Sequence, residues 1–139
     1  MFESIIISAG YDQVILICIC TLLLICFFQS GIDKIYDYRG NVLWLNEHFS
    51  KTFFKNVAPV LVVLITLLEL TTAFLFALGI MGFVGLDVAL IFSAITLLCL
   101  FLGQRIAKDY VGAYVIVVYF ILTVLGLFVF FINNAINTI

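Results

Sequence analysis

Four long apolar runs dominate the sequence and restrict the folds open to it. They cover residues 14–32, 57–78, 87–106 and 111–132. Each run has roughly 20 residues, which as a helix with a rise of about 1.5 Å per residue crosses a hydrocarbon core about 30 Å thick. Open strands are excluded because lipid cannot satisfy their backbone polar groups, and the runs lack the alternation of porin strands. We therefore predict an all-α membrane protein with a bundle of four transmembrane helices.

The composition supports a bilayer as the solvent for the whole chain. Hydrophobic residues make up 66% of the 139 residues and charged residues only 10%, against about 45–50% and about 25% in soluble domains. A soluble monomer of this composition would expose more apolar surface than water tolerates. We therefore treat residues 1–139 as a single integral membrane domain in contact with membrane lipids. The net charge of −2 gives no indication of a nucleic-acid partner.

The six basic residues fall into only two of the segments that flank the apolar runs. Four lie between the first and second runs and two between the third and fourth: Lys34, Arg39, Lys51, Lys55, Arg105 and Lys108. In a four-span protein these two segments share one side of the membrane. Because cytoplasmic loops carry an excess of lysine and arginine, we predict that the basic loops are cytoplasmic and that both termini lie outside.

An amphipathic pattern occupies residues 41–56, within the longer basic loop. Apolar residues recur there at spacings of three and four, as on one face of a helix: Val42, Leu45, Phe49 and Phe53. We predict a short interfacial helix, capped by Asn41, that follows a first helix ending at Gly40.

Two roles are open for this interfacial segment. As a lipid anchor, it would hold its aromatic side chains at headgroup depth, and its lysines would meet anionic lipid. As a docking surface, it would bind a partner subunit. The residues concerned are the same in both cases: Trp44, Phe49, Lys51, Phe53 and Lys55.

Glu69 is the most informative single residue, because it lies near the middle of the second apolar run. A charged side chain at the bilayer centre costs about 2.5–3.5 kcal/mol even on lenient insertion scales, so we expect Glu69 to face the interior of the bundle. Thr66 and Thr72 lie three residues before and after it and share its helix face. Two interpretations remain open: a proton- or ligand-binding group, or a protonated carboxyl that hydrogen-bonds across helices.

A second group of polar residues closes the first and third apolar runs on the basic side. It comprises Gln29, Asp33, Lys34, Gln104, Arg105 and Asp109. We expect Asp33 to pair with Arg105, and Lys34 with Asp109, across the bundle. The alternatives are ordinary interfacial charge that sets the orientation, or a site between helix ends for an anionic headgroup or a quinone head.

No sequence motif identifies a metal, haem or nucleotide site. His48 is the only histidine and has no cysteine or carboxylate cluster nearby, and the apolar runs contain no histidine to bind haem. Hydrolase and nucleotide motifs are absent, so no catalytic residue is identified. The four cysteines lie inside the apolar runs, where we expect small apolar fillers: Cys18, Cys20, Cys26 and Cys99. A quinone remains open as a cofactor.

The end of the first run, FFQSGIDKIYD at residues 27–37, resembles the F-x-SGxxK pattern of the DoxX family. Glu69, followed by Thr71, Thr72, Ala73 and Gly79, is similar to the second helix of that family. GQRIAKDYVGAY at residues 103–114 is similar to the junction of its third and fourth helices. The resemblance implies a small four-helix protein of the bacterial inner membrane. Some members are named as the small subunit of a thiosulfate:quinone oxidoreductase, and others are linked to redox complexes.

These observations leave three hypotheses for the function. The first is an accessory or assembly subunit of a larger, redox- or quinone-linked membrane complex, without catalytic activity of its own. The second is a quinone-binding oxidoreductase subunit that uses Glu69 or the end formed by Gln104 and Arg105. The third is a small transporter or proton-conducting oligomer built around Glu69.

Overall fold

The computed structural model describes the backbone of residues 2–138 and the side chains of residues 10–136 and 138. Within that range it contains five helices: α1 (Phe2–Tyr36), α2 (Tyr38–His48), α3 (Ala58–Ile80), α4 (Leu86–Ile106) and α5 (Tyr110–Asn137). Four segments are long and apolar enough to cross a membrane: Gly10–Tyr36, Ala58–Ile80, Leu86–Ile106 and Tyr110–Ile136. The predicted fold, four spanning helices with a short helix between the first two, is confirmed.

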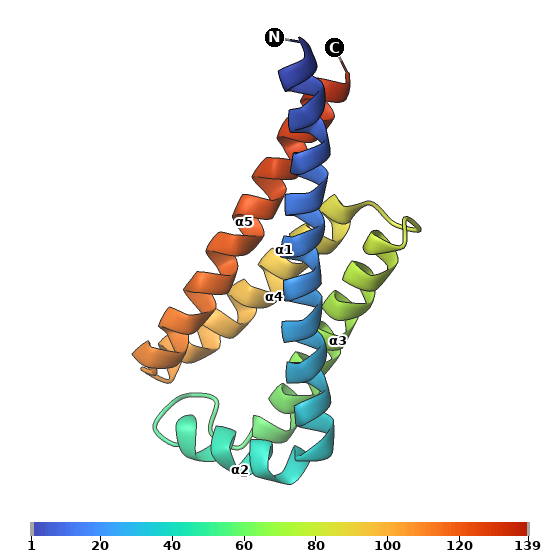
Figure 1. The fold of residues 1–139 in the computed structure, drawn as a ribbon. Coiled ribbons are helices and arrows are strands. Elements are labelled where there is room, and N and C mark those ends of the chain that lie inside the picture. Colours follow the sequence, from blue (N-terminus) through green and yellow to red (C-terminus); the bar gives the residue numbers. More distant parts are fainter. Residues whose placement is uncertain (1, 139) are drawn as a thin grey trace.

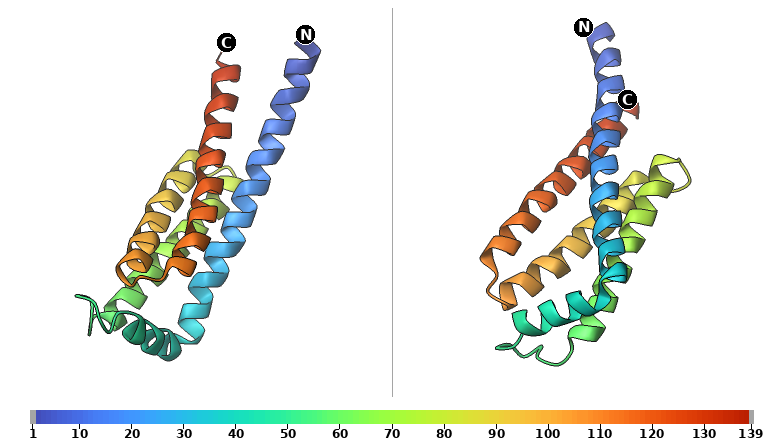
Figure 2. Two further views of the ribbon diagram at one scale, coloured as in Figure 1. Left: turned by 90° about the vertical axis from the view of Figure 1, so that its left-hand side faces the viewer. Right: turned by 60° about the horizontal axis from the view of Figure 1, so that its bottom comes forward.

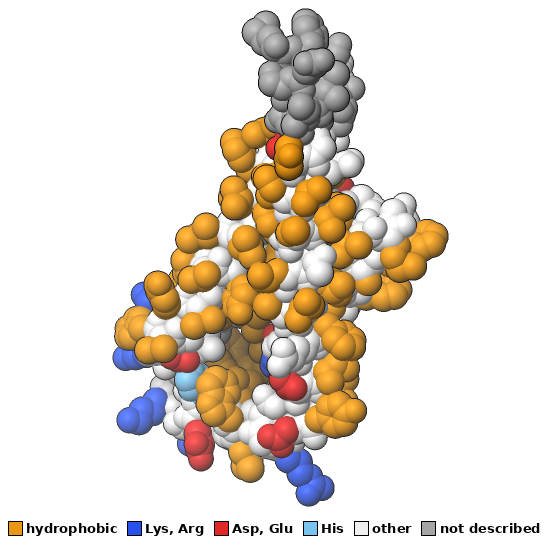
Figure 3. Space-filling model, viewed as in Figure 1, with side chains coloured by type: hydrophobic (Ala, Val, Ile, Leu, Met, Phe, Trp, Pro, Cys, Tyr) orange, Lys and Arg blue, Asp and Glu red, His pale blue; other side chains and the backbone are white. Residues whose placement is uncertain are grey.

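The four spanning helices pack in a ring. α1 packs against α3 and α5, and α4 packs against the same two helices. Both termini lie at one end of the bundle, and α2 lies across the opposite end (Figures 1 and 2). Lysine and arginine side chains gather at the end that carries α2 (Figure 3). The two basic loops therefore share one end, as four spans require.

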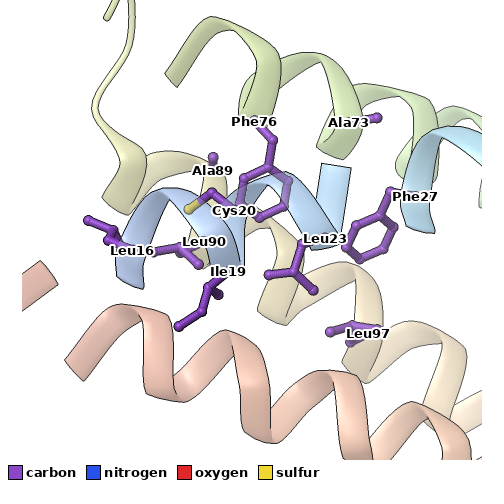
Figure 4. Close-up of a cluster of buried hydrophobic side chains, with 10 residues drawn as sticks. All are labelled: Leu16, Ile19, Cys20, Leu23, Phe27, Ala73, Phe76, Ala89, Leu90 and Leu97. Carbon is purple, nitrogen blue, oxygen red and sulfur yellow. The ribbon is translucent and has the colours of Figure 1, made fainter. Parts of the chain in front are cut away.

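The apolar core lies where α1, α3 and α4 meet (Figure 4). Its buried members are Leu16, Ile19, Cys20, Leu23, Phe27, Ala73, Phe76, Ala89, Leu90 and Leu97. The rings of Phe27 and Phe76 stack between α1 and α3, with their centroids 6.4 Å apart. Cys20 is fully buried whereas Cys18 is exposed, because residues two apart lie about 200° apart around a helix. Cys20 is thus one of the small apolar fillers that the sequence predicts.

Buried hydroxyl pairs also join the spanning helices. Thr72 Oγ1 lies 2.9 Å from Thr96 Oγ1 between α3 and α4. Ser93 Oγ lies 3.1 Å from Thr123 Oγ1 between α4 and α5. All four side chains are buried. Hydrogen bonds between membrane helices contribute about 0.6 kcal/mol on average, so these pairs fix the relative positions of the helices more than they stabilise the fold.

The junction of α1 and α2 differs from the prediction that the first helix ends at Gly40 and that Asn41 caps the next one. α1 ends at Tyr36, and α2 begins at Tyr38 with Asp37 as its N-cap. Asp37 Oδ1 accepts a hydrogen bond from the Gly40 N–H at 3.1 Å, and Asn41 Nδ2 donates to the Asp37 carbonyl oxygen at 2.8 Å. A carboxylate at this position satisfies a free N–H group and also opposes the helix dipole, so Asp37 takes the cap.

The predicted helix over residues 41–56 is shorter in the structure. α2 ends at His48, and residues 49–56 form turns that lead into α3. Ser50 and Thr52 donate their hydroxyls to backbone carbonyl groups three residues earlier, at 2.7 and 2.9 Å. Such side-chain bonds to the backbone compete with a continuing helix, which explains the early end.

Phe49 corrects a second expectation about this segment. It is only 5% exposed and packs with Leu45, Ala58 and Val62 in a small apolar cluster that joins α2 to α3. Phe49 therefore faces the protein and not the lipid headgroups, whereas Phe53 is 96% exposed. Burial of Leu45 and Phe49 holds α2 against the end of the bundle, because apolar surface removed from polar surroundings stabilises the contact.

Two helix starts follow the sequence closely. Pro59 lies in the first turn of α3, where its missing N–H costs little, and Asp87 lies in the first turn of α4. Between these helices, Gly82 adopts a φ of +82°, which glycine reaches without a Cβ clash.

Candidate functional site

A cavity of about 720 Å³ lies at the end of the bundle that carries α2. Its apolar walls come from all five helices and include Leu23, Phe27, Leu45, Val62, Leu97 and Ile116. Its polar lining includes Ser30, Lys34, His48, Glu69 and Gln104. Small-molecule pockets have volumes of about 300–1,000 Å³ and are mostly apolar with a few polar groups. The cavity therefore has the size and chemistry of a ligand site.

The main polar feature of the cavity is an ion pair between α1 and α3. Lys34 Nζ lies 2.8 Å from Glu69 Oε2 and 3.1 Å from Glu69 Oε1. Ser30 Oγ donates to Glu69 Oε1 at 3.0 Å and accepts from Lys34 Nζ at 2.8 Å. The side chain of Glu69 is 3% exposed and that of Lys34 is 20% exposed. Glu69 thus faces the interior, as predicted, and its charge is balanced within the protein.

The local sequence explains why these three side chains meet. Ser30 and Lys34 are four residues apart on α1 and therefore share one helix face. Gly31, on the same helix, allows α1 to approach α3, because a Cβ at this position would lie 2.6 Å from Cδ2 of Leu70. Leu70 follows Glu69 directly on α3. The close approach of the two helices at Gly31 places Ser30 and Lys34 within reach of the carboxylate.

A second polar group lies where α2 meets the cavity. His48 Nε2 lies 3.1 Å from Gln104 Oε1 and 3.4 Å from Asp109 Oδ2. The indole of Trp44 stacks on the His48 ring, with the centroids 4.3 Å apart. These contacts tie α2 to the C-terminal end of α4 and to the turn that follows it. Trp44 also lines the cavity and is the only tryptophan of the chain, so it reports on occupation of the cavity.

The predicted pair of Lys34 with Asp109 is wrong. Lys34 binds Glu69 instead, and Asp109 is the N-cap of α5, where its Oδ1 accepts a hydrogen bond from the Gly112 N–H at 2.9 Å. From the sequence, Glu69 and the helix-end residues form two separate groups, but the structure joins Glu69 to Lys34. The aliphatic stem of lysine reaches far along apolar surface, so the charge of Lys34 meets a carboxylate deeper in the bundle.

The predicted pair of Asp33 with Arg105 is also wrong. Among the described side chains, no salt bridge joins these two residues. The guanidinium of Arg105 lies over the ring of Tyr110, 4.8 Å from its centroid. This cation–π contact holds Arg105 at the start of α5, and both Asp33 and Arg105 are exposed.

The helix-end group predicted from the sequence is divided by the structure. Lys34 and Gln104 line the cavity. Asp109 does not line it, but its Oδ2 lies 3.4 Å from Nε2 of His48, which does. The other three residues are exposed and do not line the cavity: Gln29, Asp33 and Arg105. The residues predicted for docking divide as well, because Trp44 lines the cavity and Phe49 is buried. The exposed remainder is Lys51, Phe53 and Lys55.

Thr66 and Thr72 are buried on the same face of α3 as Glu69, as predicted. Neither binds the carboxylate. Thr66 Oγ1 donates to the Val62 carbonyl oxygen at 2.7 Å, and Thr72 contacts Thr96 of α4. Their role is therefore in helix packing beside the site.

Ser30 and His48 are site residues, although in the sequence Ser30 appears only within the SGxxK pattern and His48 only as a weak candidate for a metal ligand. Because Ser30 and Lys34 are four residues apart, the sequence does predict that they share one helix face. The same spacing joins Trp44 to His48 and indicates neighbouring rings on α2. Within the part of the chain that the structure describes, no group of three or more His, Cys, Asp and Glu residues is placed to hold a metal ion.

Comparisons of this chain with protein-family models, with curated proteins and with solved structures found no match. Its function is therefore inferred from the chemistry of the cavity.

Proposed function

We propose that this four-span membrane protein binds a neutral, lipid-soluble molecule of the quinone class in the cavity between its helices. The observation that carries the proposal is a cavity of about 720 Å³ whose apolar walls enclose one ion pair balanced within the protein. Such a site accepts a planar apolar ring and fixes its orientation with a few polar groups.

The balance of charge favours a neutral head group over an anionic one. Lys34 is the only lysine or arginine among the described residues that line the cavity, and Glu69 lies 2.8 Å from its ammonium group. A phosphate would have to share Lys34 with this carboxylate in surroundings of low dielectric constant, where like charges repel strongly. A quinone carries no charge, so it avoids that repulsion.

The polar groups of the cavity suit the two carbonyl oxygens of a quinone. On α1, at the wall shared with α3, Lys34 would turn one N–H from Ser30 or Glu69 toward a quinone carbonyl oxygen. Gln104 lines the cavity from α4, and its side-chain amide carries two N–H donors. The indole of Trp44 offers an aromatic face on α2. A quinone ring between these groups would be bound at both carbonyl ends.

We further propose that the protein is a subunit of a larger, redox-linked membrane complex, as its resemblance to the DoxX family implies. The turns over residues 49–56 would provide the docking surface, because Lys51, Phe53 and Lys55 are exposed there. Phe53 is 96% exposed, and aromatic residues are enriched at protein–protein interfaces. Electron transfer to or from the quinone would then involve the partner.

Titration with a short-tailed benzoquinone tests the ligand site directly. Because Trp44 lines the cavity, we expect saturable quenching of its fluorescence, with one quinone per chain, in nanodiscs of zwitterionic lipid. A matched control is the double variant Trp44→Phe/Phe53→Trp, which moves the only tryptophan to an exposed turn and should show only linear, unsaturable quenching. Identical unsaturable curves for both proteins would reject the site, and displacement of the quinone by anionic phospholipid would indicate a headgroup site.

The orientation in the membrane is a separate proposal. The six-to-zero distribution of Lys and Arg favours cytoplasmic basic loops and external termini in a bacterial inner membrane. We expect epitope tags at both termini to be cleaved by protease added to spheroplasts. Tags that remain protected until the membrane is broken would reverse the orientation.

A further inference from the structure

We infer that the ligand enters the cavity sideways from the bilayer, through a gap between α1 and α5, and that its apolar tail stays in this gap. The inference rests on the proposed quinone site. It adds the class of ligand that the site selects, which is a lipid with a neutral head and a long apolar chain, and excludes small water-soluble quinones as the natural ligands.

The first observation is that part of the cavity wall, between α1 and α5, is formed by a residue that is also exposed. Val115 of α5 lines the cavity and is also 48% exposed. Cys26 of α1 and Tyr119 of α5 line the cavity beside it, and their side chains adjoin each other. The molecule is hollowed on this face, between the lower halves of α1 and α5 and above α2 (Figure 3).

The second observation is that α1 and α5 touch further from α2 and diverge toward it (Figure 1). A Cβ at Gly126 of α5 would lie 3.2 Å from Cγ2 of Ile19 of α1 and 2.9 Å from Cδ2 of Leu90 of α4. The absence of a side chain at Gly126 thus permits close packing there. From this contact toward α2, the next residues at the border of the two helices are Cys26 and Tyr119, followed by the gap at Val115. The two helices therefore diverge toward α2, and the cavity lies behind the gap between them.

The surroundings of the gap identify lipid as the source of the ligand. The outer surface beside it is apolar, since Ile25, Phe28 and Val118 are 57%, 55% and 50% exposed. The opposite edge of the cavity is polar, because Asp37 and Asn41 line it at the corner between α1 and α2. This arrangement fits a molecule whose polar head lies in the cavity at interface depth and whose apolar chain extends through the gap among the acyl tails.

The end of the bundle that carries α2 offers a more polar route. α2 lies across it, held by burial of Leu45 and Phe49 against α3 and by the contacts of His48 with Gln104 and Asp109. Entry from water at this end would pass the polar corner at Asp37 and Asn41, which disfavours an apolar chain. Entry through the gap between α1 and α5 passes apolar side chains.

Substitution of Val115 by phenylalanine narrows the gap and tests the inference. Val124→Phe is the matched control, because Val124 lies on the opposite side of the same helix with nearly the same exposure, 46% against 48%, and does not line the cavity. Both variants keep Trp44 as the only tryptophan. With a decyl-tailed benzoquinone in nanodiscs, we expect Val115→Phe to slow the association observed by stopped-flow quenching by about tenfold or more, as obstructed binding requires. We expect Val124→Phe to match the wild-type rate.

A second pair of variants guards against a folding defect at Val115. Cys26→Phe narrows the other edge of the gap, and Cys18→Phe places the same ring on the exposed outer face of α1. We expect slow association only for Cys26→Phe, and a larger effect with the decyl-tailed quinone than with its methyl analogue. Wild-type rates for both gap variants would overturn lateral entry while leaving the quinone site intact. Absence of saturable binding to the wild type would instead overturn the proposed function, and the inference with it.

Discussion

Replacement of Lys34 by methionine is expected to destabilise the protein by about 3 kcal/mol, and addition of Glu69→Leu is expected to restore the stability without restoring quinone binding. Removal of one partner of a buried ion pair leaves an uncompensated charge, which costs about 3–5 kcal/mol. A charge left inside a membrane has a similar cost of about 2.5–3.5 kcal/mol. Replacement of both partners by apolar residues of similar volume is often neutral or stabilising.

Stability in this experiment is measured by SDS titration in mixed micelles, and affinity by quenching of Trp44. We expect the double variant to come within about 1 kcal/mol of the wild type in stability and to bind quinone at least about tenfold more weakly, because each tenfold change corresponds to about 1.4 kcal/mol. Lys55→Met is the matched control, since it removes an exposed lysine with the same change in net charge. A stable double variant with native affinity would make the pair purely structural.

Gly31→Ile is the second variant expected to have a large effect. A Cβ at Gly31 would lie 2.6 Å from Cδ2 and 2.7 Å from Cγ of Leu70, so the branched side chain would push α1 away from α3. Overpacking of this kind costs about 1–3 kcal/mol. The same movement would separate Lys34 from Glu69, so we expect quinone affinity to fall together with stability.

Two further variants isolate the cause of this effect. Gly10→Ile is the matched control on the same helix, because nothing lies within 4 Å of a Cβ there, and it should leave both quantities unchanged. Adding Leu70→Ala to Gly31→Ile removes the colliding atoms and should recover most of the lost stability. If Gly31→Ile alone behaves as the wild type, the close approach of α1 and α3 is not what positions the ion pair.

The spanning helices are predictable from the sequence because hydrocarbon admits few alternatives. A run of about 20 apolar residues must satisfy its backbone polar groups internally, which selects a helix. The helix starts at Pro59 and Asp87 follow from equally local causes. The interior orientation of Glu69 follows from the cost of a charge in lipid. Each of these features depends on one segment and its solvent.

The pairings at the site are harder to predict because they depend on several segments at once. Lys34 can reach carboxylates at different depths, and the choice between Asp109 and Glu69 is decided by the capping of α5 and by the approach of α1 to α3. The local pattern around residue 41 likewise allows more than one cap, and Asp37 takes that position. The cavity itself arises from the divergence of α1 and α5, for which no single segment carries a pattern.

Photocrosslinking is the most direct test of the central claim that a quinone occupies the cavity. A decyl-tailed quinone with a diazirine on its ring would be irradiated with the protein in nanodiscs, and the modified peptides identified by mass spectrometry. We predict labelling at cavity-lining positions of α1, α2 and α4, such as Phe27, Trp44 and Gly103, and competition by unlabelled quinone. Labelling spread over the outward-facing residues of the spanning helices, without competition, would contradict the account.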